Sequence, residues 1–175
     1  MIVLKFGGSS VAGANEVEQV LAVLSQQKKP MAVVVSALGG ITDELHALGK
    51  LAADGDASYA DRLKQVEERH VMMVQALIPV SKRSAILSTT KQIINKLETI
   101  LEGTSMIREL SPKTRDTLLS FGEILSHKII AEAAKAKGID AIAKNAQDLI
   151  VTFQSLGRTL VCLLYTSPSP RDCRL

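Results

Sequence analysis

The sequence predicts an α/β fold in which a mainly parallel sheet is covered by helices. Three observations lead to this expectation. Strand, helix and strand patterns follow one another within the first 36 residues, helical periodicity dominates residues 43–137, and short strand-like runs return after residue 138. The helical segment is therefore expected as an insertion between the second and third strands. Aromatic residues make up only 3% of the chain, so the core must be aliphatic.

The N-terminal pattern is that of a βαβ unit. Residues 2–6 (IVLKF) are a short apolar run that ends at Gly7 and Gly8, as expected for a buried strand. Residues 15–27 carry apolar side chains at helical spacing, and residues 31–36 (MAVVVS) are nearly all apolar. The second run is typical of a strand in a parallel sheet that is covered on both faces.

Short polar side chains near the predicted helix starts are candidates for N-caps. Ser9 or Ser10 can cap the first helix, and Asn15 is a second candidate there. Thr42 and Asp43 stand in the corresponding position before the next helix. For these two residues, capping and contact with a ligand are compatible roles.

Four helices are expected in the inserted segment. Gly103 stops the third, and residues 106–110 are expected to form a separate short helical turn. Ser111 and Pro112 open the fourth helix, because proline suits the first helical position, and Gly138 ends it. The expected helices cover residues 43–53, 59–77, 82–101 and 111–137.

The C-terminal part changes character twice. Residues 139–144 (IDAIAK) and 148–152 (DLIVT) are expected to be the third and fourth strands. From Cys162 onward the string CLLYTSPSPRD resembles a translated sequencing-library adapter, and the alternative is a genuine Pro/Ser-rich linker. We expect residues 1–161 to form a truncated catalytic domain and residues 162–175 to be a non-native or disordered tail that takes no part in the fold.

Composition excludes several classes of protein. The formal net charge of +3 is scattered, without a basic stripe and interleaved aromatics, so nucleic-acid binding is not expected. No apolar run approaches the ~20 residues that cross a bilayer, and Met1 is followed at once by a strand-like run rather than a secretory signal. The two cysteines suggest neither a metal site nor a disulfide framework. The expected compartment is the cytoplasm.

The first candidate site is the turn KFGGSS between the first strand and the first helix. Gly7 and Gly8 carry no side chains, so backbone N–H groups can approach an anion, and a helix N-terminus adds partial positive charge. Lys5 lies at the carboxyl end of the strand, where it could neutralise a transferring phosphoryl group. The pattern is neither a P-loop nor G-x-G-x-x-G. The alternative is a tight turn beside a solvent-exposed lysine.

The second candidate site follows the neighbouring strand, in SALGGITD. Ser36 and Thr42 offer hydroxyl groups, and Gly39 and Gly40 offer bare amides, which suit a small polar substrate. Because the two strands are expected to be parallel neighbours, both loops should emerge at the same edge of the sheet.

The third candidate site is Glu123 in the apolar helical segment SFGEILS. A glycine within a helix costs about 1 kcal/mol relative to alanine, so Gly122 hints at a close approach by another group. A carboxylate in apolar surroundings is costly unless it meets a cation. The cation can be the ammonium group of a substrate, or an internal partner such as Lys128 or Arg115.

The three segments KFGGSS, VVVSALGGITDEL and SFGEILS together resemble the aspartokinases of the amino-acid-kinase fold, over residues 1–152. The segment SPKTRDTLLSFGEILS is similar to the kinase part of bifunctional aspartokinase–homoserine dehydrogenases. The resemblance implies a three-layer sandwich, of which this chain would hold only the N-terminal, aspartate-binding lobe. The later arginine–glycine-rich block and the nucleotide-binding lobe of that family do not occur in it.

The resemblance implies phosphoryl transfer from ATP, with Mg²⁺, to the side-chain carboxylate of L-aspartate. Lys5 would act in catalysis, the first motif would contact the ATP phosphates, and the other two motifs would contact aspartate. By residue, the implied nucleotide contacts are Lys5, Gly7, Gly8 and Ser9, and the implied aspartate contacts are Ser36, Thr42 and Glu123. No protein ligand for a metal ion is expected, because Mg²⁺ should be held by the nucleotide and water.

Two other functions remain open at this point. The protein could be another amino-acid kinase, acting on glutamate, carbamate or a nucleotide, or it could be a small-molecule-binding or assembly module without catalysis. The resemblance implies a homo-oligomer for the full-length protein. The 175-residue chain by itself is expected to be inactive.

Overall fold

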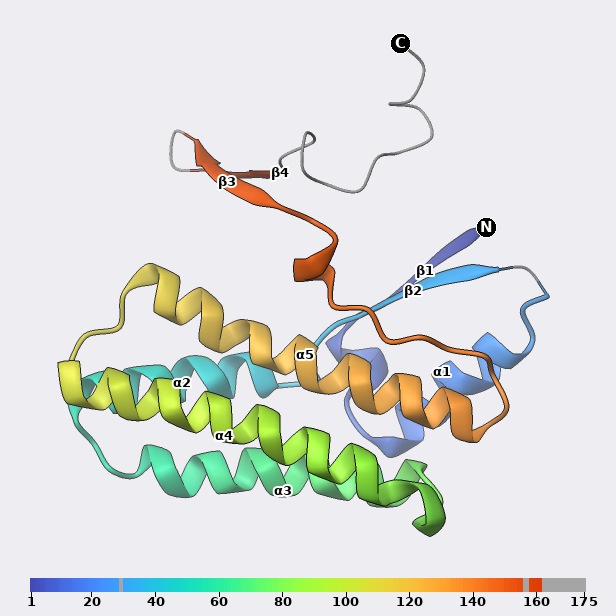
Figure 1. The fold of residues 1–175 in the computed structure, drawn as a ribbon, viewed down its shortest axis with the longest axis horizontal. Coiled ribbons are helices and arrows are strands. Elements are labelled where there is room, and N and C mark those ends of the chain that lie inside the picture. The colour runs from blue at the N-terminus through green and yellow to red at the C-terminus, as the bar shows by residue number, and fades with distance from the viewer. Residues whose placement is uncertain (29, 156–157, 162–175) are drawn as a thin grey trace. The chain divides into compact units, whose positions relative to one another are not determined.

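A computed structural model describes residues 1–28, 30–155 and 158–161 of the chain. The chain divides into two compact units, Met1–Ile142 and Ala143–Leu175, and each is described separately (Figure 1). The first unit contains the three candidate site segments. Among the described residues, no helix combines the length and the apolar character needed to cross a membrane.

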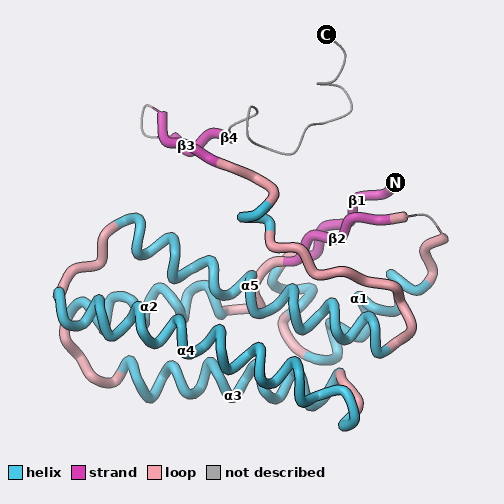
Figure 2. Tube along the Cα trace, in the orientation of Figure 1, coloured by secondary structure: helices cyan, strands magenta, loops and turns pink. Residues whose placement is uncertain are grey.

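The first unit begins with a two-stranded parallel sheet. Strand β1 (Ile2–Phe6) pairs with β2 (Met31–Val35), and the connection runs through the 3₁₀ helix η1 (Gly8–Val11) and helix α1 (Ala14–Ser25) (Figure 2). This confirms the predicted βαβ unit. Both strands are rich in β-branched residues, which suit a pleated surface.

The two strands have one covered face and one exposed face. Leu4 and Val33 pack against the core, whereas Val3 and Val34 point the other way and are 64% and 51% exposed. This alternation follows from the two-residue period of a strand. In the part of the chain that the structure describes, the expectation of a sheet covered on both faces is therefore wrong.

Four long helices form the body of the first unit (Figure 1). They are α2 (Ile41–Asp54), α3 (Tyr59–Leu77), α4 (Arg83–Ile107) and α5 (Pro112–Ala136), with the short 3₁₀ helix η2 (Val80–Lys82) before α4. The core between them is almost entirely aliphatic, as predicted. Its large, fully buried side chains include Leu45, Leu48, Ile94, Leu97, Leu101, Leu118, Leu125 and Ile129.

Helix α4 continues through the glycine that was expected to stop it. Gly103 lies inside the helix, which ends only at Ile107 and is followed by the C-cap Arg108, where φ is 56°. The neighbouring Leu101 and Thr104 are buried, so packing of this turn offsets the ~1 kcal/mol cost of a helical glycine. The prediction of a separate turn over residues 106–110 is also wrong, since Met106 and Ile107 belong to α4.

The predicted N-caps of the first two helices are wrong. Helix α1 begins after Gly13 with no side-chain cap, Ser9 and Ser10 lie within η1, and Asn15 lies within α1. Helix α2 begins after Gly40, also without a side-chain cap, so its first turn already contains Thr42 and Asp43. Gly40 has φ of +79°, a conformation that glycine adopts without strain.

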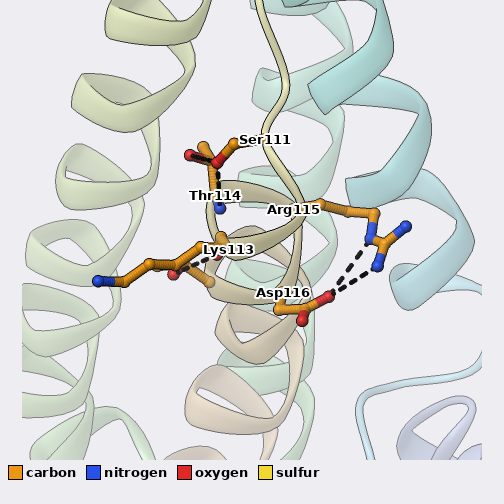
Figure 3. A network of polar contacts seen from close by, with 6 residues as sticks. Ser111, Lys113, Thr114, Arg115 and Asp116 are labelled. Atoms are coloured by element: carbon orange, nitrogen blue, oxygen red, sulfur yellow. Dashed lines mark hydrogen bonds and ion pairs between the residues drawn. The ribbon is translucent and has the colours of Figure 1, made fainter. Parts of the chain in front are cut away.

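The start of α5 agrees with the prediction. Ser111 is the N-cap, its hydroxyl oxygen accepts a 3.1 Å hydrogen bond from the N–H of Thr114, and Pro112 is the first helical residue (Figure 3). In the same first turns of α5, the guanidinium of Arg115 forms an ion pair with Asp116 at 3.2 Å. Gly138, with φ of +83°, follows the end of the helix.

Residues 139–144 do not form the expected strand. Ile139 and Ala141 turn towards the core while Ile142 is exposed, so the side chains alternate as in a strand. However, in the described part of the chain the first sheet contains only β1 and β2. Without a partner, the backbone groups of this segment have no ladder to join, and it stays a loop.

The second unit contains a β-hairpin. The 3₁₀ helix η3 (Ala146–Asp148) is followed by β3 (Thr152–Ser155), which pairs antiparallel with β4 (Arg158–Val161). The prediction of a strand over residues 148–152 is wrong except at its last residue. Asn145 explains part of the difference, because its side chain accepts a hydrogen bond from Gln147 N–H and favours a turn there. Residues 162–175 lie outside the described part, so the division at 161/162 remains a prediction.

Candidate functional site

Both glycine-bearing loops leave the sheet at the same edge, as predicted. Phe6 and Val35 are paired in register at the carboxyl ends of β1 and β2, and the N–H of Ser36 donates a 3.1 Å hydrogen bond to the carbonyl oxygen of Phe6. The loops that begin at Gly7 and at Ser36 therefore start as neighbours. This edge is where open α/β sheets place their ligands.

The first loop places a lysine ammonium beside a bare backbone segment. Its turn is closed by a 2.9 Å hydrogen bond from Ser10 N–H to the carbonyl oxygen of Gly7. A Cβ atom built on Gly7 would lie 3.8 Å from Nζ of Lys5, so the ammonium group lies over this glycine. Lys5 and Ser9 are exposed. The arrangement offers an exposed cation and bare backbone amides to an anion.

The two loops also pack directly against each other. A Cβ on Gly39 would come within 2.9 Å of Ala12 Cβ and 3.2 Å of the carbonyl oxygen of Gly8. A Cβ on Gly8 would lie 3.4 Å from the carbonyl oxygen of Ala37. Gly39 is therefore needed for loop packing, which is a second reason for glycine there besides access for a ligand, whereas a Cβ on Gly8 would make only an ordinary van der Waals contact.

Helix α5 approaches the second loop closely at Gly122. A Cβ there would come within 2.7 Å of Ala37 Cβ and within 3.4 Å of Ile41 and Leu45 side chains. Real Cβ atoms do not come this close, so position 122 must lack a side chain. The predicted close approach at this glycine is confirmed, and the approaching group is the loop after β2.

Glu123 lies next to this contact but has no internal cation. Its side chain is exposed, and Oε1 accepts a 3.4 Å hydrogen bond from the N–H of Ala37. Arg115 pairs with Asp116 instead, and no ion pair joins Lys128 to Glu123 within the described residues. Of the two alternatives for the cation, the internal salt bridge with Lys128 or Arg115 is therefore wrong. The carboxylate reaches solvent rather than an apolar interior, so it does not require one.

Ser126 is a residue of this site that the sequence analysis missed. Its side chain is fully buried on α5, and its hydroxyl donates a 2.7 Å hydrogen bond to the carbonyl oxygen of Ser36. The available signal was a small polar residue on the apolar face of the helix, one turn after Gly122. A buried hydroxyl is costly unless it is hydrogen-bonded, which makes such a residue informative.

The two remaining predicted residues, Ser36 and Thr42, belong to the loop after β2 and to the start of α2. Ser36 is half-buried at the start of the second loop, and Thr42 is exposed in the first turn of α2. His127 on α5 donates from Nδ1 to the carbonyl oxygen of Glu123 at 2.8 Å, and burial lowers its pKa, which favours the neutral ring. The three sequence motifs are thus joined through contacts of the second loop, with Gly8 on one side and with α5 on the other.

The chain is similar to known proteins over most of its length. The amino acid kinase family matches residues 1–161. Aspartokinase 1, chloroplastic, from Arabidopsis thaliana is 36% identical over 143 residues, which is 79% of this chain and 24% of the relative. The aspartokinase of Candida albicans is 31% identical over 156 residues, covering 85% of this chain and 28% of the relative. A bifunctional aspartokinase/homoserine dehydrogenase of Arabidopsis thaliana is 28% identical over 148 residues, which is 84% of this chain and 16% of the relative. The chain thus spans between about a sixth and just over a quarter of these relatives.

Solved structures show the same fold. Escherichia coli aspartokinase III, in complex with aspartate and ADP, matches with a TM-score of 0.82 at 22% identity, over 94% of this chain and 35% of that protein. Clostridium acetobutylicum aspartate kinase matches with a TM-score of 0.66 at 24% identity, over 86% of this chain and 31% of that protein. The α/β fold class and the resemblance to aspartokinases are confirmed, and the relatives include proteins named aspartokinase and proteins named bifunctional aspartokinase/homoserine dehydrogenase. The chain belongs to the amino acid kinase family.

Proposed function

We propose that the full-length protein is an aspartate kinase, which transfers the γ-phosphate of ATP to the side-chain carboxylate of L-aspartate and forms 4-phospho-L-aspartate. The observation that carries the proposal is the meeting of three distant motifs at the carboxyl edge of β1 and β2. The similarity to aspartokinases supports it, and the E. coli relative was solved with aspartate and ADP.

In this proposal the first loop binds the phosphates. Lys5 supplies a positive charge beside Gly7, and the amides of Gly7, Gly8 and Ser9 supply N–H donors. The acceptor carboxylate has an unperturbed pKa near ~3.9 and is ionised at neutral pH, so no general base is required. Phosphoryl transfer needs charge neutralisation and in-line positioning instead.

Mg²⁺ is proposed to arrive with the nucleotide. Among the described residues there is no group of three or more His, Cys, Asp or Glu side chains that could hold a metal ion. The ion would be held by phosphate oxygens and water, which is a common mode of Mg²⁺ binding in kinases.

The second loop and α5 are proposed to bind aspartate. Ser36 and Thr42 offer hydroxyl groups to the substrate. One carboxylate oxygen of Glu123 already accepts from Ala37 N–H, which leaves the second oxygen for the substrate ammonium. A carboxylate with four acceptor positions can serve both partners at once.

The wider assignments are also proposals. The product would enter lysine, threonine and methionine biosynthesis, and the full-length protein would be a cytoplasmic homo-oligomer, although the plant relatives are chloroplastic. The 175-residue chain is proposed to be inactive alone, because the arginine–glycine-rich block implied by the resemblance does not occur in it.

A hydroxamate assay on the full-length protein tests the function, with ATP and either aspartate or glutamate as acceptor. The expected result is acyl-phosphate formation with aspartate only, and loss of at least about 100-fold in turnover in Lys5→Ala. Lys50→Ala, an exposed lysine on α2, is the matched control. Preference for glutamate would indicate another amino-acid kinase, and unchanged turnover in Lys5→Ala would favour a non-catalytic module.

A further inference from the structure

Helix α5 binds both polar groups of one peptide unit in the second loop. The carbonyl oxygen of Ser36 accepts a 2.7 Å hydrogen bond from the hydroxyl of Ser126. The N–H of Ala37, at the other end of the same peptide bond, donates to Oε1 of Glu123 at 3.4 Å. Ser126 and Glu123 are three residues apart on the helix. The side chains of one helical turn therefore hold the Ser36–Ala37 peptide.

This pairing selects one orientation of the peptide plane. In a trans peptide the C=O and N–H point in opposite directions, and no cis peptide bond occurs among the described residues. Residues three apart on a helix lie about 5–6 Å from each other, which matches partners on the two sides of a peptide. Turning the plane over would direct the Ser36 carbonyl oxygen at the Glu123 carboxylate. Two negative oxygens would then face each other, which disfavours that orientation.

Packing makes the orientation costly to change. Ala37 and Ser126 are buried, at 2% and 0% exposure, and Gly122 brings the helix backbone close to Ala37. The hydroxyl of Ser126 also lies 3.2 Å from the carbonyl oxygen of Glu123, but it has a single proton and the contact to Ser36 is shorter. Removing the hydroxyl would leave the buried end of the peptide without its donor.

We propose that Ser126 is a positioning residue for the acceptor substrate, acting through the Ser36–Ala37 peptide. The inference rests on the proposed aspartate kinase function. The orientation of this peptide sets the direction of the Ser36 side chain and the path of Gly39 and Gly40 into α2. Ser126 does not touch the substrate, and its effect reaches the acceptor pocket through the loop.

The expected signature is a selective change in acceptor binding. The loop from Ser36 belongs to the acceptor pocket, whereas the phosphate loop is held by its own hydrogen bond between Ser10 and Gly7. Ser126→Ala should therefore raise KM for aspartate about 3- to 10-fold, the effect of losing one neutral hydrogen bond. KM for ATP should change less than about 2-fold.

A matched control lies on the same helix. Ser120 donates its hydroxyl to the carbonyl oxygen of Thr117 at 2.7 Å, within α5 itself. Ser120→Ala removes the same atoms and the same type of bond without touching the loop, so both KM values should stay at wild-type levels. Cysteine has a weak S–H donor and is similar in size to serine, so Ser126→Cys should give a KM for aspartate between those of the wild type and Ser126→Ala. If the alanine variant does not fold, Ser126→Cys provides the measurement instead.

The experiment is steady-state kinetics of the full-length protein and these variants. An unchanged KM for aspartate in Ser126→Ala or Ser126→Cys, or equal rises in both KM values, would overturn the positioning role while leaving the proposed function intact. A wild-type protein that does not phosphorylate aspartate would instead overturn the proposed function. The two failures are therefore distinguished by the wild-type measurement.

Discussion

Gly122 of α5 lies against Ala37 of the loop after β2, so closely that a Cβ at position 122 would stand 2.7 Å from the Ala37 Cβ. The two residues are far apart in the sequence, and they bring the helix of the third motif onto the loop of the second. Absence of a side chain at position 122 is what allows Glu123 and Ser126 to reach the backbone of that loop.

Gly122→Ala is therefore expected to destabilise the protein, although alanine is the better helix former. The overlap with Ala37 should cost about 1–3 kcal/mol, which exceeds the gain of about 1 kcal/mol in helix propensity. Gly103→Ala is the control, because that glycine lies inside α4 and a Cβ there would meet no other described part of the chain within 4 Å beyond its own helix backbone, so it should raise stability. Calorimetric midpoints of the full-length variants measure both effects. A stabilised Gly122→Ala would contradict the contact.

Gly39→Ala is expected to separate the two glycine loops. The new methyl group would meet Ala12 Cβ at 2.9 Å and the Gly8 carbonyl oxygen at 3.2 Å, so one loop has to move. Because both loops belong to the proposed site, KM for ATP and KM for aspartate should both rise, in contrast to Ser126→Ala. Steady-state kinetics with each substrate varied in turn tests this. A variant with wild-type values for both substrates would show that the loops move independently.

His70 is expected to make stability depend on pH in mildly acidic solution. The ring is fully buried on α3, Nδ1 donates to the Val66 carbonyl oxygen at 2.7 Å, and Nε2 has no partner among the described residues. Burial lowers its pKa, so the folded protein holds the ring neutral. Below the unfolded pKa of about 6.5 the unfolded state binds the proton more readily, and stability should fall as the pH decreases.

Denaturant unfolding between about pH 5 and 8 measures this dependence. Stability should be flat above about pH 6.5 and decline below it. His127 also has a pKa lowered by burial, so the comparison is made in a His127→Gln background. In that background His70→Phe should make the free energy of unfolding less dependent on pH below about pH 6.5. If the free energy of unfolding falls equally steeply below about pH 6.5 with and without His70, groups other than His70 cause the sensitivity to acid.

The ion pair between Arg62 and Glu44 is expected to fix α3 against α2. The guanidinium makes two hydrogen bonds of 2.7 Å to the two carboxylate oxygens, and this pairing raises the pKa of Arg62. Arg62→Lys should lower the thermal midpoint because lysine cannot make the bidentate contact. Lys64→Ala breaks only the exposed pair with Asp61 and should leave the midpoint unchanged. Equal effects of the two substitutions would contradict the bridging role.

Local sequence signals were sufficient where contacts between residues close in sequence determine the conformation. Helix α3 has the predicted bounds, Tyr59–Leu77, and β1 and β2 lie where the apolar runs place them. Ser111 and Pro112 start α5 as expected, because a cap is a contact within a few residues. Such features need only the period of the apolar residues and the chemistry of the residues at the ends.

Local sequence signals were misleading where contacts with residues far away in the sequence determine the conformation or the burial of a side chain. Gly103 looked like a helix end, but buried neighbours keep α4 intact to Ile107. Residues 139–144 have an alternating pattern, but no strand of the described sheet pairs with them. Glu123 looked like a buried charge because its neighbours in sequence are apolar, yet it is exposed. In each case the sequence neighbours were not the spatial neighbours.

The sequence by itself determined the βαβ start, the long helical segment after it, the aliphatic core and the three motifs that resemble aspartokinases. Tertiary structure decided how those motifs meet: Gly39 against Gly8, Gly122 against Ala37, and Ser126 on the carbonyl of Ser36. The physical reason is that periodicity reports which face of an element is apolar. Which backbone group a buried hydroxyl or a bare glycine meets depends on helix and loop packing across 90 residues of chain.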